Sequence, residues 1–170
     1  MHEALMILIF LGGVAVASLL IKSLFRDKAF PYFVRGKCWV VDADDISVNG
    51  QQIRLSGIDA PESDQIATRW DGSTYESGEV VKRMLCKKIG GKIVDVQIEG
   101  TDKYGRKIGT VFLNGQDINR RMVRKGLAVA AYGNQYKEDE SFARKQRNGM
   151  WGDKIAYDPR HWKHGKHVPI

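Results

Sequence analysis

Two Asn-Gly pairs, at residues 49–50 and 114–115, divide the chain into short apolar segments. Both residue types accept a positive φ angle, so Asn-Gly between alternating segments is the strongest local signal for a tight hairpin. The first pair lies between residues 46–48 and 53–55, in which apolar and polar side chains alternate. The sequence therefore predicts a hairpin here, within a fold that places several short strands side by side.

The other periodic segments predict an α+β domain built on a small barrel. Short apolar or alternating runs indicate three further strands, at residues 38–41, 93–98 and 108–113. Amphipathic patterns indicate three helices, at residues 74–88 (after a capping-box pattern at 73–76), 117–125 and 138–148. One helix inserted among five strands, with two helices after them, fits this architecture.

An apolar segment without a charged residue occupies residues 4–21. Its 18 residues reach about 27 Å as a helix, which is just enough to cross a bilayer core. Two interpretations compete, a single-pass anchor in the cell membrane and a signal peptide cleaved after the small residues 15–17. The usual basic residues before the apolar run are missing and instead follow it, so we expect an uncleaved anchor. The side of the membrane stays open.

The remaining chain divides into a linker at residues 22–33, a domain at 34–152 and a basic tail at 153–170 that contains three His residues. A metal site in the tail is one interpretation, and a flexible tail that holds polyanions is the favoured one. With 43% hydrophobic and 28% charged residues, the chain is neither a disordered tail nor a multi-pass membrane protein. Its two Cys residues exclude a disulfide-framework miniprotein.

The net charge of +7 is concentrated in the last third of the chain. Residues 22–100 hold equal numbers of acidic and basic side chains, whereas residues 101–170 hold 15 Lys and Arg against 7 Asp and Glu. Such a surface suits nucleic acid, an acidic polysaccharide or an anionic membrane. A solvated basic face without a specific partner is an equally good interpretation.

Three polar stretches have the residues that cleavage of a phosphodiester requires. They are Asp-Ala-Asp-Asp at residues 42–45, Arg54 followed by Gly-Ile-Asp-Ala-Pro-Glu at 57–62, and Asp-Lys-Tyr-Gly-Arg at 102–106. Carboxylates from two loops suit a hard cation such as Ca²⁺. Arginine offers a planar, permanently charged fork for phosphate oxygens, and a further carboxylate can activate water.

Each stretch also has a structural interpretation. Asp favours turns, so residues 42–45 and 102–106 can be ordinary charged turns. With a two-residue turn at Asn49-Gly50, the simplest register places Asp45 opposite Arg54 as a cross-strand ion pair. A one-residue bulge would instead bring Asp44 alongside Arg54, as a shared site requires.

Together and in this order, the three stretches resemble the motifs of the thermonuclease family, the staphylococcal nuclease-like proteins. Residues 42–45 are similar to that family's Asp-Gly-Asp-Thr motif, and residues 54–62 to its Arg strand leading to Asp-(Thr/Ala)-Pro-Glu. Its Asp-Lys-Tyr-Gly-Arg turn occurs unchanged at residues 102–106, and residues 123–128 resemble its helix-to-strand passage. The resemblance covers about residues 34–152.

This resemblance implies a five-stranded OB-fold barrel with three helices and a nuclease site that holds one Ca²⁺ or another divalent metal. Asp44, Asp59 and the Ala60 carbonyl would be the metal ligands. Glu62 would orient or deprotonate water, and Arg54 and Arg106 would clamp the scissile phosphate. The resemblance also places Tyr104 and Lys103 beside the nucleotide.

Two positions depart from the family motif. Ala43 stands where the motif has Gly, which would strain a turn that needs positive φ. Asp45 stands where the motif has Thr and adds a carboxylate beside the expected metal. Either change could alter the choice of metal or the activity.

The sequence therefore favours a membrane-tethered, metal-dependent nuclease that cleaves single- or double-stranded DNA, and RNA, with little sequence specificity. The resemblance implies 3′-phosphate ends. The alternative is a non-catalytic OB-fold module that binds nucleic acid or an acidic polysaccharide at the cell envelope. Arg54, Glu62 and Arg106 are all present, which favours the enzyme. No protein partner is predicted.

Overall fold

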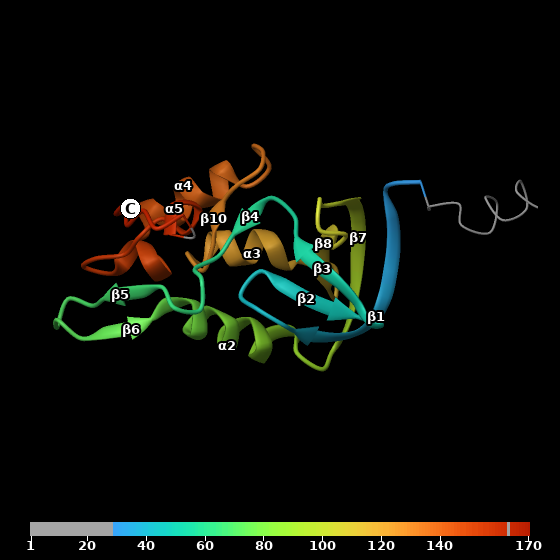
Figure 1. Ribbon diagram of the computed structural model, residues 1–170, viewed down its shortest axis with the longest axis horizontal. Coiled ribbons are helices and arrows are strands. Elements are labelled where there is room, and N and C mark those ends of the chain that lie inside the picture. Colours follow the sequence, from blue (N-terminus) through green and yellow to red (C-terminus); the bar gives the residue numbers. More distant parts are fainter. Residues whose placement is uncertain (1–28, 163) are drawn as a thin grey trace, which may run out of the picture.

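The computed structural model describes residues 29–162 and 164–170 (Figure 1). The predicted membrane segment at residues 4–21 and residues 22–28 of the predicted linker lie outside them. Within the described part of the chain, no helix is both long and apolar enough to cross a bilayer.

A closed barrel of five strands forms the centre of the domain, as predicted. The strands are β1 (Tyr32–Val40), β2 (Asp45–Val48), β3 (Gln51–Leu55), β7 (Ile93–Thr101) and β8 (Lys107–Leu113). Neighbouring strands pair antiparallel in the order β3-β2-β1-β7-β8, and a parallel pairing of β3 with β8 closes the barrel. Buried Val94, Val96 and Ile98 follow every second position of β7 and fill the interior.

The β2–β3 hairpin has the predicted turn and register. Asn49 and Gly50 both have positive φ angles, of 52° and 77°. This conformation matches the two-residue turn that joins strands of ordinary twist. The pairing sets Asp45 opposite Arg54. The conformation of this turn thus fixes the position of Arg54, an expected site residue.

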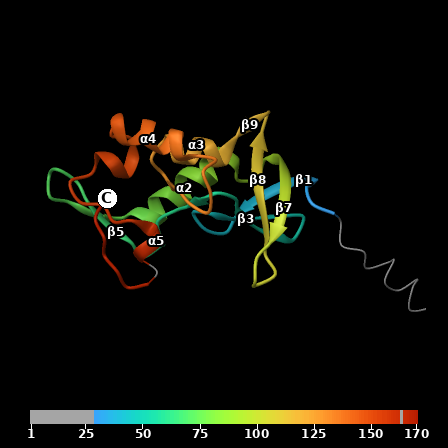
Figure 2. The ribbon, with the colours of Figure 1, turned by 90° about the horizontal axis from the view of Figure 1, so that it is seen from above.

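Three helices pack around the barrel, as predicted: α2 (Ser77–Ile89), α3 (Ile118–Arg124) and α4 (Lys137–Lys145). Helices α2 and α3 pack against the barrel, and α4 packs against α3 farther from the strands (Figures 1 and 2). The fully buried Asn119 of α3 fixes the closure of the barrel. Its amide donates to the Ser56 carbonyl at 2.9 Å and to the Gly109 carbonyl at 3.2 Å.

Short elements complete the described chain. They are β4 (Ile58–Asp59) paired with β10 (Val129–Ala130), β5 (Ile66–Thr68) paired with β6 (Thr74–Glu76), β9 (Gln116–Asp117) beside β8, a 3₁₀ turn (Gly149–Gly152) and α5 (Pro159–Trp162). The β5–β6 hairpin projects away from the barrel (Figure 1).

Two predicted helix boundaries are wrong. The first helix begins at Ser77 rather than residue 74, because residues 74–76 pair with β5 instead. The expected capping box does not form, since the Ser73 hydroxyl donates to Asp71 at 2.7 Å. The last helix ends at Lys145 rather than residue 148, and Arg147 then adopts a positive φ of 53°, which ends helical geometry.

The expected flexible tail is instead folded against the domain, and we call residues 153–162 and 164–170 the C-terminal clasp. Its Tyr157 carbonyl accepts a hydrogen bond of 2.8 Å from the side chain of Gln65, which is 2% exposed. The indole of Trp162 donates to Asp64 at 3.0 Å and stacks on His167. These contacts join the end of the chain to the segment between β4 and β5.

An ion pair inside the clasp gives a stability prediction. Asp158 is buried and accepts several hydrogen bonds from Arg160. Burial alone would raise the pKa of Asp158, but the hydrogen bonds and charge of Arg160 hold it below its ordinary 3.8. A carboxylate of lowered pKa stabilises the fold at neutral pH, and this contribution is lost as pH falls below about 3.8.

We therefore expect Asp158→Asn to lower the free energy of unfolding at pH 7 by about 1–2 kcal/mol. The effect is of this size because the Asp158 carboxylate is buried while its partner Arg160 is partly exposed. Urea unfolding at pH 7 and pH 3 measures this, and the difference from wild type should shrink at pH 3. Asp95→Asn, which removes an exposed ion pair with Arg35, is the matched control and should cost much less. Equal effects of both variants would contradict this role for the clasp.

Candidate active site

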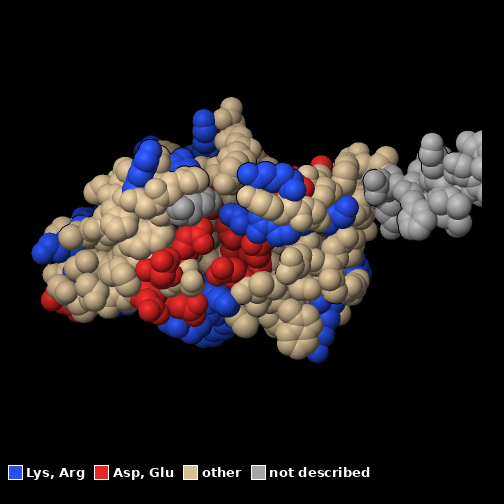
Figure 3. All heavy atoms as spheres, viewed as in Figure 1, with Lys and Arg blue, Asp and Glu red and all other residues tan. Residues whose placement is uncertain are grey.

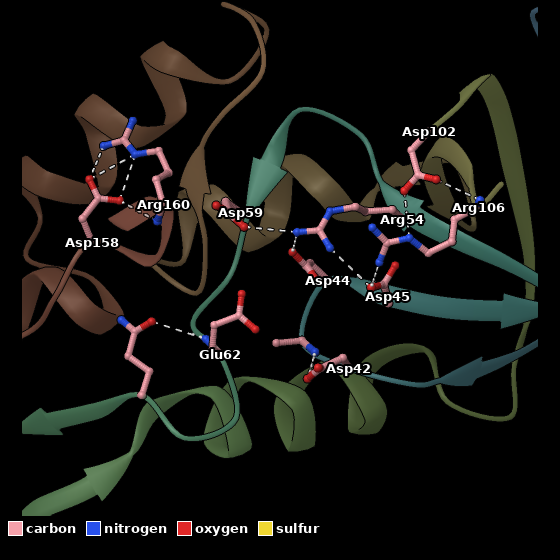
Figure 4. Close-up of polar contacts among 12 residues, drawn as sticks. Asp42, Asp44, Asp45, Arg54, Asp59, Glu62, Asp102, Arg106, Asp158 and Arg160 are labelled. Carbon is pink, nitrogen blue, oxygen red and sulfur yellow. Dashed lines mark hydrogen bonds and ion pairs between the residues drawn. The ribbon is translucent and has the colours of Figure 1, made fainter. Parts of the chain in front are cut away.

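One guanidinium group joins the first two polar stretches (Figure 4). Arg54 lies at the end of β3, and its Nη2 lies 2.6 Å from Asp44 and 3.2 Å from Asp59. Its Nη1 lies 3.4 Å from Asp45. Asp44 and Asp45 precede and begin β2, whereas Asp59 is in β4. A single side chain thus contacts carboxylates from two separate segments of the chain, residues 44–45 and residue 59.

The sequence left two alternatives for this hairpin, with either Asp45 or Asp44 beside Arg54, and the structure has both contacts. The simple register holds, with Asp45 opposite Arg54 and no bulge. Arg54 still reaches Asp44, because the chain turns just before β2 and the Asp44 carbonyl accepts a hydrogen bond of 2.9 Å from the Leu55 amide. The guanidinium fork then spans both neighbouring carboxylates. The bulge that a shared site was expected to require is therefore unnecessary.

The third stretch brings Arg106 to the same place. Asp102 organises its turn by accepting hydrogen bonds of 2.9 Å from the amides of Tyr104 and Arg106. The same carboxylate holds the Arg106 guanidinium at 2.8 Å, and Arg106 Nη1 lies 2.8 Å from Asp45. Asp45 consequently bridges Arg54 and Arg106.

The two departures from the family motif therefore have clear structural roles. Ala43 is absent from the described residues with positive φ, so its methyl group causes no strain there, and it is 2% exposed within the core. Asp45 acts as the counter-ion shared by two arginines. Ala43 is thus part of the hydrophobic core, and Asp45 helps to position Arg54 and Arg106.

A groove of about 660 Å³ passes over this cluster. Its lining includes the expected site residues Arg54, Glu62, Lys103, Tyr104 and Arg106. Figure 3 shows acidic atoms gathered in a hollow of this face, with basic side chains along its upper edge. The groove therefore has fixed positive charge beside carboxylates, as a phosphate-cleaving site needs.

Backbone packing positions Glu62. Its amide donates to the side chain of buried Gln65 at 3.3 Å, and Gly78 at the start of α2 lies directly against its carbonyl. A Cβ atom at Gly78 would lie 2.0 Å from the Glu62 carbonyl oxygen. Figure 4 places the Glu62 carboxylate between the Asp59 and Asp42 loops. Glu62 is near enough to Asp44 to raise the pKa of that carboxyl.

Several buried carboxyl groups in this cluster lie close together around the positive charge of Arg54. Burial raises the pKa of Asp44 to about 7, Arg54 opposes this shift, and neighbouring carboxylates reinforce it. Burial also raises the pKa of Asp45. For Arg54, burial alone would lower the pKa, but the three Asp residues raise it overall. The cluster thus has a strong attraction for positive charge.

The chemistry of the donors fits a hard cation. Oxygens of Asp44 and Asp59 converge on the same nitrogen, Arg54 Nη2, so together they form a cradle for positive charge. The two carboxylates are 7% and 0% exposed. Within residues 29–162 and 164–170, no set of three or more His, Cys, Asp and Glu side chains is arranged as a metal cage. The remaining ligands would be the Ala60 carbonyl, water and substrate oxygens.

The groove also contains two residues that the sequence did not indicate. Tyr132 is 73% exposed and has a positive φ of 54°, a conformation that non-glycine residues adopt rarely. His164 reaches the groove from the C-terminal clasp. Tyr132 has no local motif that would have identified it, and His164 was assigned to a flexible tail.

Comparison with known proteins agrees with this arrangement. The family described as "Staphylococcal nuclease homologue" matches residues 52–153. The chain belongs to the staphylococcal nuclease family. The order of the motifs, the barrel and the shared groove are thus features of a staphylococcal nuclease domain, and the family supports nuclease activity in general.

Relatives differ in how much of their length this chain spans. It is 35% identical to an uncharacterized endonuclease of Escherichia coli O157:H7, over 75% of this chain and 82% of that protein. It is 34% identical to a micrococcal nuclease of Shigella flexneri, over 73% and 76%. It is also 35% identical to an uncharacterized 38.1 kDa protein of Capnoides sempervirens, over 72% of this chain but 35% of that protein.

The contact between Gly78 and Glu62 gives a prediction for this nuclease domain. Gly78→Ala must displace the backbone of Glu62, because the carbonyl cannot avoid the new methyl group. We expect a loss of stability of about 1–3 kcal/mol, as for overpacking elsewhere. The cleavage rate of the folded fraction should also fall, because the displaced backbone moves the Glu62 carboxylate.

Gly100→Ala is the matched control, because no atom lies within 4 Å of a Cβ there. Thermal unfolding and cleavage assays on the folded fraction measure both effects. Normal cleavage by folded Gly78→Ala would show that the position of Glu62 does not limit the reaction.

Proposed function

We propose that this chain is a metal-dependent nuclease that hydrolyses phosphodiester bonds of DNA and RNA with low sequence specificity. One Ca²⁺, or another divalent metal, and membrane attachment through residues 4–21 are parts of the proposal. The observation that supports it best is the convergence of Arg54, Arg106 and Glu62 on one groove above buried Asp44 and Asp59.

Each group in the groove has a role in hydrolysis. Asp44, Asp59 and the Ala60 carbonyl would hold a divalent cation, which would supply neutralisation of phosphate charge and a more acidic water. Arg54 and Arg106 donate to the non-bridging phosphate oxygens and stabilise the charge that develops during attack. Glu62 orients the attacking water and accepts its proton. Cleavage of the 5′ P–O bond leaves 3′-phosphate ends.

The exposed residues at the edge of the groove position the strand. Tyr104 is 73% exposed and lies beside Lys103 and Arg106. An aromatic face with adjacent cations suits a base and its phosphate, independently of the base identity. We therefore assign Tyr104 and Lys103 to substrate binding and expect a preference for single-stranded or locally opened substrate.

Cleavage assays on the full chain test this function. With Ca²⁺, single-stranded and double-stranded DNA should be cut, and a chelator should stop the reaction. Glu62→Gln and Arg106→Ala should each reduce kcat by at least about 10²-fold, the scale of losing a general base or a charge-stabilising group. Products should accept 3′ extension by a polymerase only after phosphatase treatment.

Glu138→Gln is the control, because this exposed residue of α4 is a Glu outside the groove. It should cleave normally. Binding of oligonucleotides without cleavage under any divalent metal would favour the alternative, a non-catalytic OB-fold module. Near-normal cleavage by folded Glu62→Gln and Arg106→Ala would overturn the residue assignments.

A further inference from the structure

A second groove lies outside the candidate active site. It has a volume of about 730 Å³ and runs between α3, α4 and the turn before β9. Three arginines of α3, the lysine that follows this helix and two aromatic rings line the groove, together with the carboxylate of Asp117. We call this the basic groove and define it by Arg120, Arg121, Arg124, Lys125, Phe112 and Phe142. The positive charge of the last third of the chain is thus partly concentrated in a concave site.

Buried and aromatic partners hold two of these cations in place. Asp139, which is 9% exposed, lies 3.4 Å from Arg120 and 3.1 Å from Arg124. The Arg124 guanidinium also lies 3.9 Å from the centre of the Phe142 ring. Both arginine side chains remain about half exposed. They are therefore oriented in advance and still accessible, which lowers the entropy lost when they bind an anion.

The other two cations lack a counter-ion. Among the described residues, no carboxylate lies within ion-pair distance of Arg121 or Lys125. Without a direct ion pair, these two cations attract solvent counter-ions. Release of such ions is the main driving force when a protein binds a polyanion.

The basic groove shares no lining residue with the groove of the candidate active site, which we call the catalytic groove. Strand β8 connects them, because Ile108 lines the catalytic groove and Phe112 lines the basic groove. Figure 2 shows β9 and α3 at one end of β8 and the loop after β7 at the other. The distance along the strand is about 14 Å. The basic groove is therefore separate from the phosphate clamp of Arg54 and Arg106.

We propose that the basic groove binds the phosphodiester backbone of single-stranded nucleic acid, at a part of the polymer remote from the bond being cut. This rests on the proposed nuclease function. The catalytic face is rich in carboxylates (Figure 3), so it attracts a long polyanion weakly away from its arginines. A groove with planar guanidinium groups and aromatic rings suits a strand with phosphates and bases, whereas a flat lipid surface cannot enter it.

Binding without catalysis tests this site. Full-length Glu62→Gln protein is titrated against a fluorescent 30-nucleotide strand in chelator, at several salt concentrations, by anisotropy. Adding Arg121→Gln and Lys125→Gln should weaken binding and reduce the slope of log affinity against log salt by about 1.4, because two phosphate contacts are lost. Arg83→Gln with Lys87→Gln removes two exposed charges from α2 and should change the slope little.

Activity measurements separate this site from the proposed function. In the wild-type background, Arg121→Gln with Lys125→Gln should raise KM for long strands and leave cleavage of a nucleotide aryl ester unchanged, because that ester is too small to reach both grooves. If the chain cleaved nothing, the loss of binding and of salt slope would still support the basic groove.

Two results would overturn the proposal. One is an unchanged affinity and salt slope in the double variant, which would identify a solvated basic face. The other is normal strand binding combined with lost binding to phosphatidylserine vesicles, which would identify a lipid-facing surface.

Discussion

The contact of Arg54 with three carboxylates is the interaction on which the candidate site depends. Asp44 and Asp59 are nearly or fully buried, and together with Asp45 they lie within 2.6–3.4 Å of one guanidinium. Buried like charges without a counter-charge would be strongly destabilising. Arg54 is placed for this role by barrel closure, because β3 pairs with β2 on one side and with β8 on the other. The same strand pairings therefore close the barrel and position the side chain at the centre of the site.

Local patterns in the sequence predicted part of the barrel and of the candidate site. The Asn49-Gly50 turn fixed the β2–β3 register, and that register places Asp45 opposite Arg54. The resemblance of three motifs to a known family correctly predicted the barrel. The structure places Arg54, Glu62 and Arg106 in the lining of one groove, while their roles stay a prediction. The hairpin register was predictable because turn chemistry acts through neighbouring residues, whereas the barrel followed from the order of the three motifs along the chain.

Other features depend on contacts that no local pattern encodes. The C-terminal clasp is held by a hydrogen bond between Gln65 and Tyr157, 92 residues apart. His164 reaches the groove through that clasp. The capping box failed for a similar reason, because pairing of β6 with β5 took the residues that would have begun the helix. Tertiary contacts override local propensity at these places.

The two grooves divide the work expected of an enzyme that acts on a polyanion. The catalytic groove combines carboxylates with two clamping arginines, so its net attraction for a long strand is small. The basic groove, at the other end of β8, has cations in excess of carboxylates. If both proposals hold, this separation would let the cleavage site keep the acids that a cation requires, while a different surface retains the polymer.

Arg54 occupies a cradle of carboxylates that attracts positive charge, and in the proposed function a metal ion would share this cradle or compete for it. Calorimetric titration of Ca²⁺ into wild-type and Arg54→Gln protein at pH 8 tests it directly. Removing the guanidinium should tighten Ca²⁺ binding by about tenfold or more, since a repulsive charge beside the ion disappears. Unchanged or weaker Ca²⁺ binding by a variant with native circular dichroism would contradict the account.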